Sequence, residues 1–233
     1  LVRQVVEINR RFRTNTTSVA GVYPFTYFLG WTKALKAEDV IIKPAFETLR
    51  TVFQPVLISP ECWQRNVYSG DKLKMRLCLV NDDESYRDLG PTVADVKVLD
   101  SNGVTIASGS VDFAATKYYS NSWQDVTIEI PASTPKGYYD VRCTLTEDGR
   151  EISKNSFQTS VAPRSWVKAP TAAVTLFDPS GAAAQAFDEL GIKYQKVSDL
   201  RKMPESGTLV IGESALAEGN YPDKAAVLAF LAK

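Results

Sequence analysis

Histidine is missing from this chain of 233 residues, and cysteine occurs only three times. Without an imidazole, the chain offers no Ser-His-Asp or Cys-His activation of a nucleophile and no histidine ligand for a metal ion. The spacing of Cys62, Cys78 and Cys143 matches no zinc-binding pattern. We therefore expect three free thiols, no metal site and no cofactor. Acid–base chemistry would fall to aspartate and glutamate.

An excess of charge of either sign is also lacking, because Lys+Arg and Asp+Glu both number 27. A chain with no net charge and no basic run has no long-range field that would attract nucleic acid or an anionic membrane. No apolar stretch approaches the roughly 20 residues that a membrane-spanning helix needs. We therefore expect neither nucleic acid nor a membrane as a partner.

The pattern of apolar residues changes twice along the chain. Residues 1–54 read as a helix, an apolar strand at residues 19–29 and a second helix that begins at Pro44. Residues 55–163 read as about seven short alternating strands, which is typical of an immunoglobulin-like sandwich. Residues 172–233 read as β-α-β-β-α, which is about half of a doubly wound fold. The sequence thus predicts a multidomain protein with α/β and β parts.

In two of these strands, the alternation of apolar and polar residues indicates which face of the strand each cysteine occupies. In the strand that includes residues 73–79, Cys78 shares the polar face with Lys74 and Arg76. Cys143 lies on the apolar face of its own strand. A disulfide between two residues that face opposite ways is not expected.

Three tryptophans are candidates for binding a sugar ring by stacking. Trp31 follows the apolar strand at residues 19–29, where it could line a substrate pocket. Trp63 and Trp123 could form a platform on the surface of the sandwich, although packing against a neighbouring domain explains them as well. Asp178 or Ser180 is expected to cap the helix that follows.

Four segments carry a family resemblance. They are Gly21-Val22-Tyr23-Pro24-Phe25-Thr26, Lys43-Pro44-Ala45-Phe46-Glu47-Thr48-Leu49, Phe53-Gln54-Pro55-Val56-Leu57-Ile58 and, after Trp63, Asn66-Val67-Tyr68-Ser69-Gly70-Asp71. Together they resemble the end of a bacterial glycoside hydrolase family 2-type protein, similar to β-galactosidases. The part from Ala172 onward resembles the start of a flavodoxin-like, glutamine-amidotransferase-like domain, as found on some β-galactosidases.

The resemblance implies a different role for each part of the chain. Residues 1–54 would be the end of a (β/α)8 catalytic barrel, and residues 55–163 an accessory sandwich behind it. The two glutamates of the retaining mechanism would lie upstream of Leu1, so this chain receives no catalytic residue. The amidotransferase-like part has no cysteine or histidine for glutaminase chemistry. The resemblance also implies a periplasmic or secreted protein.

The sequence therefore predicts the non-catalytic C-terminal portion of a glycoside hydrolase, with carbohydrate as partner of the parent enzyme and homo-oligomer formation as a further role. Two alternatives stay open. One is a carbohydrate-binding immunoglobulin-like module, in which Trp63 or Trp123 stacks on a sugar. The other is a small-ligand enzyme built on residues 172–233, which the half-length fold disfavours.

Overall fold

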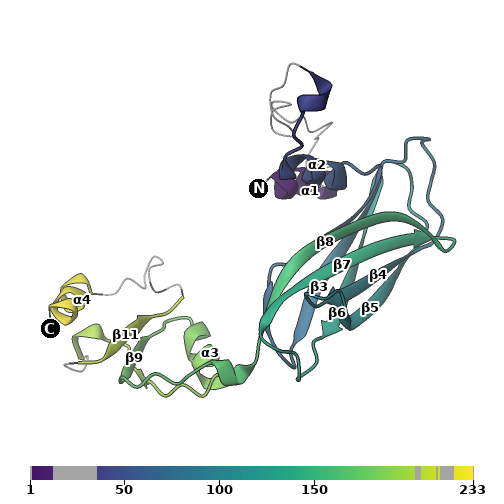
Figure 1. Ribbon diagram of the computed structural model, residues 1–233. Helices are drawn as coiled ribbons and strands as arrows, with labels where there is room; N and C mark the ends of the chain where they lie inside the picture. Colours follow the sequence, from purple (N-terminus) through teal and green to yellow (C-terminus); the bar gives the residue numbers. More distant parts are fainter. Residues whose placement is uncertain (1, 13–35, 203–205, 214, 216–222, 233) are drawn as a thin grey trace. The chain divides into compact units, whose positions relative to one another are not determined.

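The computed structural model describes residues 2–12, 36–202, 206–213, 215 and 223–232 (Figure 1). The chain forms two compact units, Leu1–Pro163 and Arg164–Lys233. The strand predicted at residues 19–29 and the candidate Trp31 lie outside the described residues.

The first unit is built on two β-sheets (Figure 1). One sheet has three strands in the order β1-β3-β6, and the other has five strands in the order β2-β8-β7-β4-β5. Neighbouring strands run antiparallel except β2 and β8, which are parallel. The strands are β1 (Val56–Glu61), β2 (Asn66–Tyr68), β3 (Lys72–Asn81), β4 (Thr92–Leu99), β5 (Thr105–Phe113), β6 (Ser120–Glu129), β7 (Gly137–Glu147) and β8 (Arg150–Ala162).

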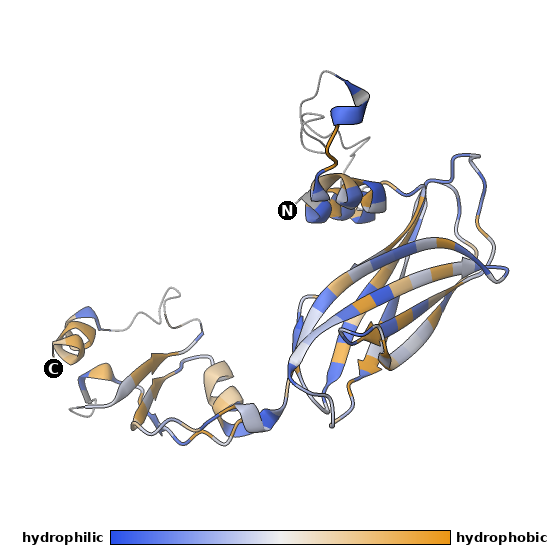
Figure 2. Cartoon of the chain, in the orientation of Figure 1, coloured by the Kyte–Doolittle hydropathy of each residue, from blue (hydrophilic) through white to orange (hydrophobic). Residues whose placement is uncertain are grey.

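The core lies between the two sheets. In β3, buried Leu73 and Leu77 alternate with exposed Lys74 and Arg76, and β4 alternates in the same way. Figure 2 shows this alternation as orange and blue bands along the strands. Burying a side chain as large as leucine contributes roughly 1.5–3 kcal/mol, so one continuous core from both sheets accounts for the stability of the unit. This described part is therefore β-rich with two packed sheets; the assignment of residues 1–54 to a barrel end stays a prediction.

Two helices belong to the same unit. α1 (Val2–Phe12) packs against α2 (Pro44–Val52), which has proline in its first turn and follows the short 3-10 helix η2 (Ala37–Asp39). α1 also contacts β3 on the outer face of the three-stranded sheet. There the ring of Phe12 lies 5.8 Å from the ring of Trp123, between centroids.

The position of α1 corrects the expectation for Cys78. The side chain does face away from Leu77, as the alternation predicts, but it is fully buried with Leu57 and Val80 against Trp123. A sheet face that carries lysine and arginine at one end reads as a solvent face in the sequence. In the structure, α1 covers the other end of that face.

The second unit contains a parallel three-stranded sheet in the order β10-β9-β11. Asp178 follows β9, and its Oδ2 accepts a hydrogen bond at 2.8 Å from the Ala184 amide in the first turn of the next helix, although the N-cap residue itself is Gly181. Ser180 Oγ accepts from the Ala182 amide at 3.3 Å. The elements are η3 (Arg164–Trp166), β9 (Val174–Phe177), α3 (Ala182–Glu189), β10 (Gln195–Lys196), η4 (Leu200–Lys202), β11 (Thr208–Ile211) and α4 (Lys224–Leu231).

Candidate functional site: a cleft beside the first helix

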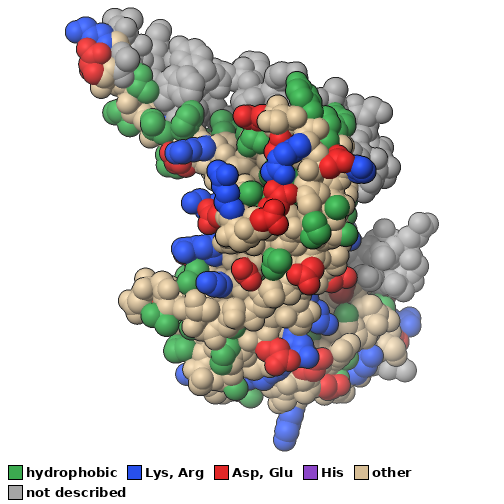
Figure 3. Space-filling view, turned by 90° about the vertical axis from the view of Figure 1, so that its right-hand side faces the viewer, with side chains coloured by type: hydrophobic (Ala, Val, Ile, Leu, Met, Phe, Trp, Pro, Cys, Tyr) green, Lys and Arg blue, Asp and Glu red, His purple; other side chains and the backbone are tan. Residues whose placement is uncertain are grey.

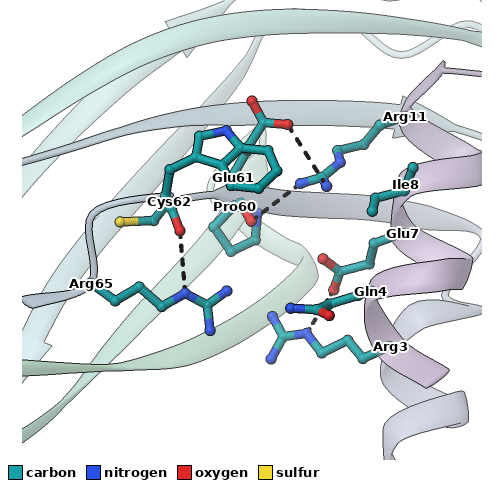
Figure 4. Close-up of a pocket in the computed structure, with 10 residues that line it drawn as sticks. Arg3, Gln4, Glu7, Ile8, Arg11, Pro60, Glu61, Cys62 and Arg65 are labelled. Atoms are coloured by element: carbon teal, nitrogen blue, oxygen red, sulfur yellow. Dashed lines mark hydrogen bonds and ion pairs between the residues drawn. The ribbon is translucent and has the colours of Figure 1, made fainter. Parts of the chain in front are cut away.

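One cleft of about 530 Å³ lies between α1 and the end of β1 (Figure 4). The helix contributes Arg3, Glu7 and Arg11, and the opposite wall is formed by Glu61 and the turn that follows it. The helix presents charged side chains here because residues 3, 7 and 11 recur every four positions and so share one face. A second hollow of about 610 Å³ shares Glu61 and Trp63 with the first.

Glu7 joins three elements at the base of the cleft. It is only 4% exposed, and its Oε1 accepts hydrogen bonds from Arg3 Nε at 2.8 Å and from Asn155 Nδ2 at 3.0 Å. Its Oε2 accepts from Ser59 Oγ at 3.0 Å. A buried carboxylate is tolerated when it is paired and hydrogen-bonded in this way. Glu7 thereby ties α1 to β1 and β8.

Arg10 makes the second attachment of α1. Its Nη1 donates to the carbonyl oxygens of Val52 at 2.6 Å and Gln54 at 2.8 Å, at the end of α2. Its Nη2 donates to Asp82 Oδ2 at 2.7 Å, directly after β3. One buried guanidinium therefore fastens both helices to the sheet, and we call this contact the Arg10 clamp.

Glu61 is the second buried carboxylate of the cleft. It is 7% exposed and accepts two hydrogen bonds from Arg76, at 3.1 Å from Nε and 2.7 Å from Nη2. This bonding raises the pKa of Arg76. Arg11 Nη2 lies 3.8 Å from the other oxygen of Glu61. Both cleft carboxylates are thus hydrogen-bonded to arginine.

The candidate tryptophans differ in their surroundings. Trp63 is 84% exposed and lines both hollows, so its ring is open to a ligand. Trp123 is half-buried; the guanidinium of Arg76 lies over it at 4.5 Å and Phe12 packs beside it. These contacts occupy the ring of Trp123. Trp63, whose ring is exposed, is therefore the better candidate for stacking on a sugar.

Several residues of the cleft are not evident from the sequence. Glu7 and Arg11 are charged residues of an amphipathic helix, which normally face solvent. Glu61 ends β1 and Arg65 lies in the polar turn that follows, with no motif around either residue. The one sequence feature that could indicate the cleft is the spacing of Arg3, Glu7 and Arg11, which places three charged residues on one helix face.

Neither metal clusters nor membrane-spanning helices occur in the described part of the chain. Its histidine, cysteine, aspartate and glutamate side chains form no group of three that could hold a metal ion. No helix in these segments is both long and apolar enough to cross a membrane. On the face shown in Figure 3, Lys and Arg lie interspersed with Asp and Glu.

The three cysteines are free and buried. Burial raises the pKa of the Cys78 and Cys143 thiols from 9.0 to about 12. Burial also raises the pKa of the Cys62 thiol, against the opposing effect of nearby Arg65. Since the thiolate is the reactive form, none of the three is suited to act as a nucleophile near neutral pH.

We predict that the native protein reacts slowly with a thiol reagent at about pH 8 and that urea exposes three reactive thiols. Folding keeps Cys78 and Cys143 protonated up to about pH 12, whereas the unfolded thiols ionise near 9.0. The unfolded state therefore binds fewer protons above pH 9, and stability should fall as the pH rises from 9 toward 12. Urea unfolding at several pH values measures this fall. A thiol that is labelled at the rate of a free cysteine at about pH 8 contradicts the burial.

No protein-family model matches this chain, and no curated protein matches it. Among solved structures, it is similar to a family 2 glycosyl hydrolase from Bacteroides cellulosilyticus, with a TM-score of 0.33 and 14% identity over 46% of this chain and 14% of that chain. It is also similar to Spo0M, a sporulation control protein from Bacillus subtilis, with a TM-score of 0.40 and 12% identity over 48% of this chain and 51% of that chain.

A third similar structure is the CARDB domain of a Pyrococcus furiosus protein, with a TM-score of 0.32 and 14% identity over 48% of this chain and 97% of that chain. The chain spans 14% of the length of the glycosyl hydrolase that it matches. The likeness to family 2 glycosyl hydrolases is thus distant and partial, and proteins of other kinds share it. These matches do not single out one family.

Proposed function

We propose that this chain is the non-catalytic C-terminal portion of a glycoside hydrolase, where it holds the last barrel helices and the accessory sandwich together as one body. The proposal starts from the resemblance carried by residues 20–82. The observation that supports it best is the Arg10 clamp, because a single buried side chain joins α1, the end of α2 and Asp82 beside the sheet. Such an attachment suits a role in positioning.

The state of the cleft carboxylates agrees with a role other than catalysis. Glu7 and Glu61 are both buried and both bonded to arginine. A retaining glycosidase needs one carboxyl group that is protonated and one that is free to attack. In this proposal carbohydrate is the partner of the parent enzyme, the compartment is the periplasm or the exterior, and self-association is a further use of the accessory units.

We predict that this chain alone does not hydrolyse any of a panel of chromogenic glycosides, whereas its full-length parent does. The reason is that both catalytic glutamates are expected in the parent's upstream part. Release of the chromophore measures the activity of each protein. Turnover by the chain itself would contradict the proposal, and Glu7→Gln and Glu61→Gln variants would then show whether the cleft is the active site. An inactive parent would equally count against it.

A second candidate function is that of a carbohydrate-binding module. The observation that favours it is Trp63, which is 84% exposed and lines a cleft of about 530 Å³. Large exposed tryptophan rings next to polar groups are a common means of holding a sugar. This function does not exclude the first, since one unit could both position the enzyme and hold its substrate.

A further inference from the structure

We propose that the cleft between α1 and the turn after β1 binds a sugar that carries a carboxylate, with Trp63 under the sugar ring and Arg11 and Arg65 facing the acid group. This inference rests on the second candidate function and names its ligand class and its site. The walls of the cleft are those drawn in Figure 4.

Arg11 supplies the first argument, because its guanidinium is buried with unused bonding capacity. The residue is 5% exposed, and its Nε has no hydrogen-bond partner among the described residues. Two of its polar contacts are long: Nη1 to the Pro60 oxygen at 3.4 Å and Nη2 to Glu61 Oε2 at 3.8 Å. A guanidinium offers five N–H donors, so Arg11 has donors that are not used in short hydrogen bonds. An anion in the cleft could give the Nη groups of Arg11 a closer acceptor than Pro60 and Glu61 provide.

Arg65 supplies a second guanidinium that is already oriented. Its Nε donates to the Cys62 oxygen at 3.2 Å, and its guanidinium lies over the ring of Phe157 at 5.1 Å from the centroid. These two contacts fix the side chain, and Figure 4 shows it reaching from the turn toward α1. No carboxylate is bonded to it in the described part of the chain. A preorganised arginine fork is suited to a carboxylate.

The charge balance of the cleft favours an anion. Four guanidinium groups, those of Arg3, Arg11, Arg65 and Arg76, surround the carboxylates of Glu7 and Glu61. Lys74 and Asp125 of the adjoining hollow offset each other. Glu7 is satisfied by Arg3 and Glu61 by Arg76, which leaves the charges of Arg11 and Arg65 in excess. Opposite charge is attracted to such an excess, most strongly where water is partly excluded.

Trp63 indicates that the ligand of the cleft is a sugar acid rather than a simple inorganic anion. Its ring is 84% exposed and lines the same cleft as the two arginines. Phosphate or sulfate would gain nothing from an aromatic face, whereas the apolar face of a pyranose ring packs well on one. The volume of about 530 Å³ also lies within the range of small-molecule sites, roughly 300–1,000 Å³.

The test is titration calorimetry of the whole chain with glucuronate, glucose and acetate. We expect glucuronate to bind at least about tenfold more tightly than either glucose or acetate, because only glucuronate offers both a ring and a carboxylate. Trp63→Ala should abolish the heat of binding for both sugars. Arg65→Gln should weaken glucuronate about tenfold and leave glucose within about twofold.

Two matched variants control for general effects. Trp166→Ala removes another exposed tryptophan, 58% exposed and in the second unit. Arg150→Gln removes an exposed arginine at the β7–β8 turn. Both should leave glucuronate binding unchanged. The substituted side chains Trp63 and Arg65 are exposed, so an unchanged unfolding midpoint should confirm that their variants remain folded.

The outcomes separate this inference from the function on which it rests. Equal affinity for glucuronate and glucose would overturn the preference for an acid and leave sugar binding in place. Acetate that binds as tightly as glucuronate would reduce the cleft to a simple anion site. If none of the three binds, both the inference and the carbohydrate-binding function are wrong, while the positioning role is unaffected.

Discussion

Replacing Arg10 with methionine is expected to lower the free energy of unfolding of the first unit by about 3 kcal/mol. The change removes the ion pair of Asp82 with Arg10 at 2.7 Å and the hydrogen bonds that Arg10 donates to the carbonyl oxygens of Val52 and Gln54; the Pro55 oxygen keeps the Asp82 amide as a donor at 3.0 Å. Breaking a buried ion pair costs about 3–5 kcal/mol. Asp82 retains 23% exposure of its side chain and regains some water, which places the expected loss at the lower end. Urea unfolding followed by tryptophan fluorescence measures the loss.

The matched control is Arg50→Met on α2. The Arg50 side chain is 75% exposed, and its nearest carboxylate oxygen, of Glu47, is 3.9 Å away. Exposed ion pairs contribute about 0–1 kcal/mol, so this variant should be close to the parent chain in stability. If Arg10→Met costs no more than Arg50→Met, the helices are not fastened in the way that the distances indicate. The support that the clamp gives to the positioning role would then be lost.

Gly207→Ala is expected to destabilise the second unit by about 3 kcal/mol or more. Gly207 has φ of +120°, and a Cβ added there would lie 2.6 Å from the backbone oxygen of Ala173. The left-handed backbone alone costs a non-glycine residue roughly 1–2 kcal/mol, and displacing the backbone oxygen of Ala173 adds a steric cost of roughly 1–3 kcal/mol. The oxygen of Ala173 also accepts the Thr208 amide at 2.8 Å, so the clash would separate β9 from β11. Amide hydrogen exchange in β9 and β11 reports this opening.

Gly191→Ala provides the comparison in the same unit. Gly191 also has a left-handed backbone, with φ of +67°, but nothing lies within 4 Å of an added Cβ. Its substitution should cost only the backbone part, about 1–2 kcal/mol. Similar hydrogen exchange in the two variants would show that the Ala173 contact relaxes freely and would contradict the larger effect at Gly207.

Most strands of the two sheets are predictable from sequence, because apolar and polar residues alternate along them and turn residues bound them. β3 occupies residues 72–81 as its alternation indicates, from Lys72 to Asn81. β5 is longer than its sequence suggests and continues to Phe113, because Gly109 and its serine neighbours carry no apolar signal. β2 has only three residues, too few for a period, and so it is absent from the sequence-based prediction.

The cleft could not be predicted in the same way. Its charged residues come from α1, from β1 and from the turn after β1, and their proximity follows from tertiary packing rather than from spacing. Of the apolar residues that have helical spacing in α1, Val6 is buried, whereas Val5 is 46% exposed. The same pattern assigns Glu7, Arg10 and Arg11 to solvent, because no local rule shows that a sheet will cover them. Burial of Cys78 escapes prediction for the same reason.

The contacts of Glu7 and Arg3 with Asn155 join residues 148 and 152 positions apart in the chain. During synthesis, at roughly 5–20 residues per second, Asn155 follows α1 after about 7–30 s. For that interval Glu7 can bond Ser59 of β1, but its bond to β8 is not yet available. The attachment of α1 to the sheets is thus completed only when β8 has been made.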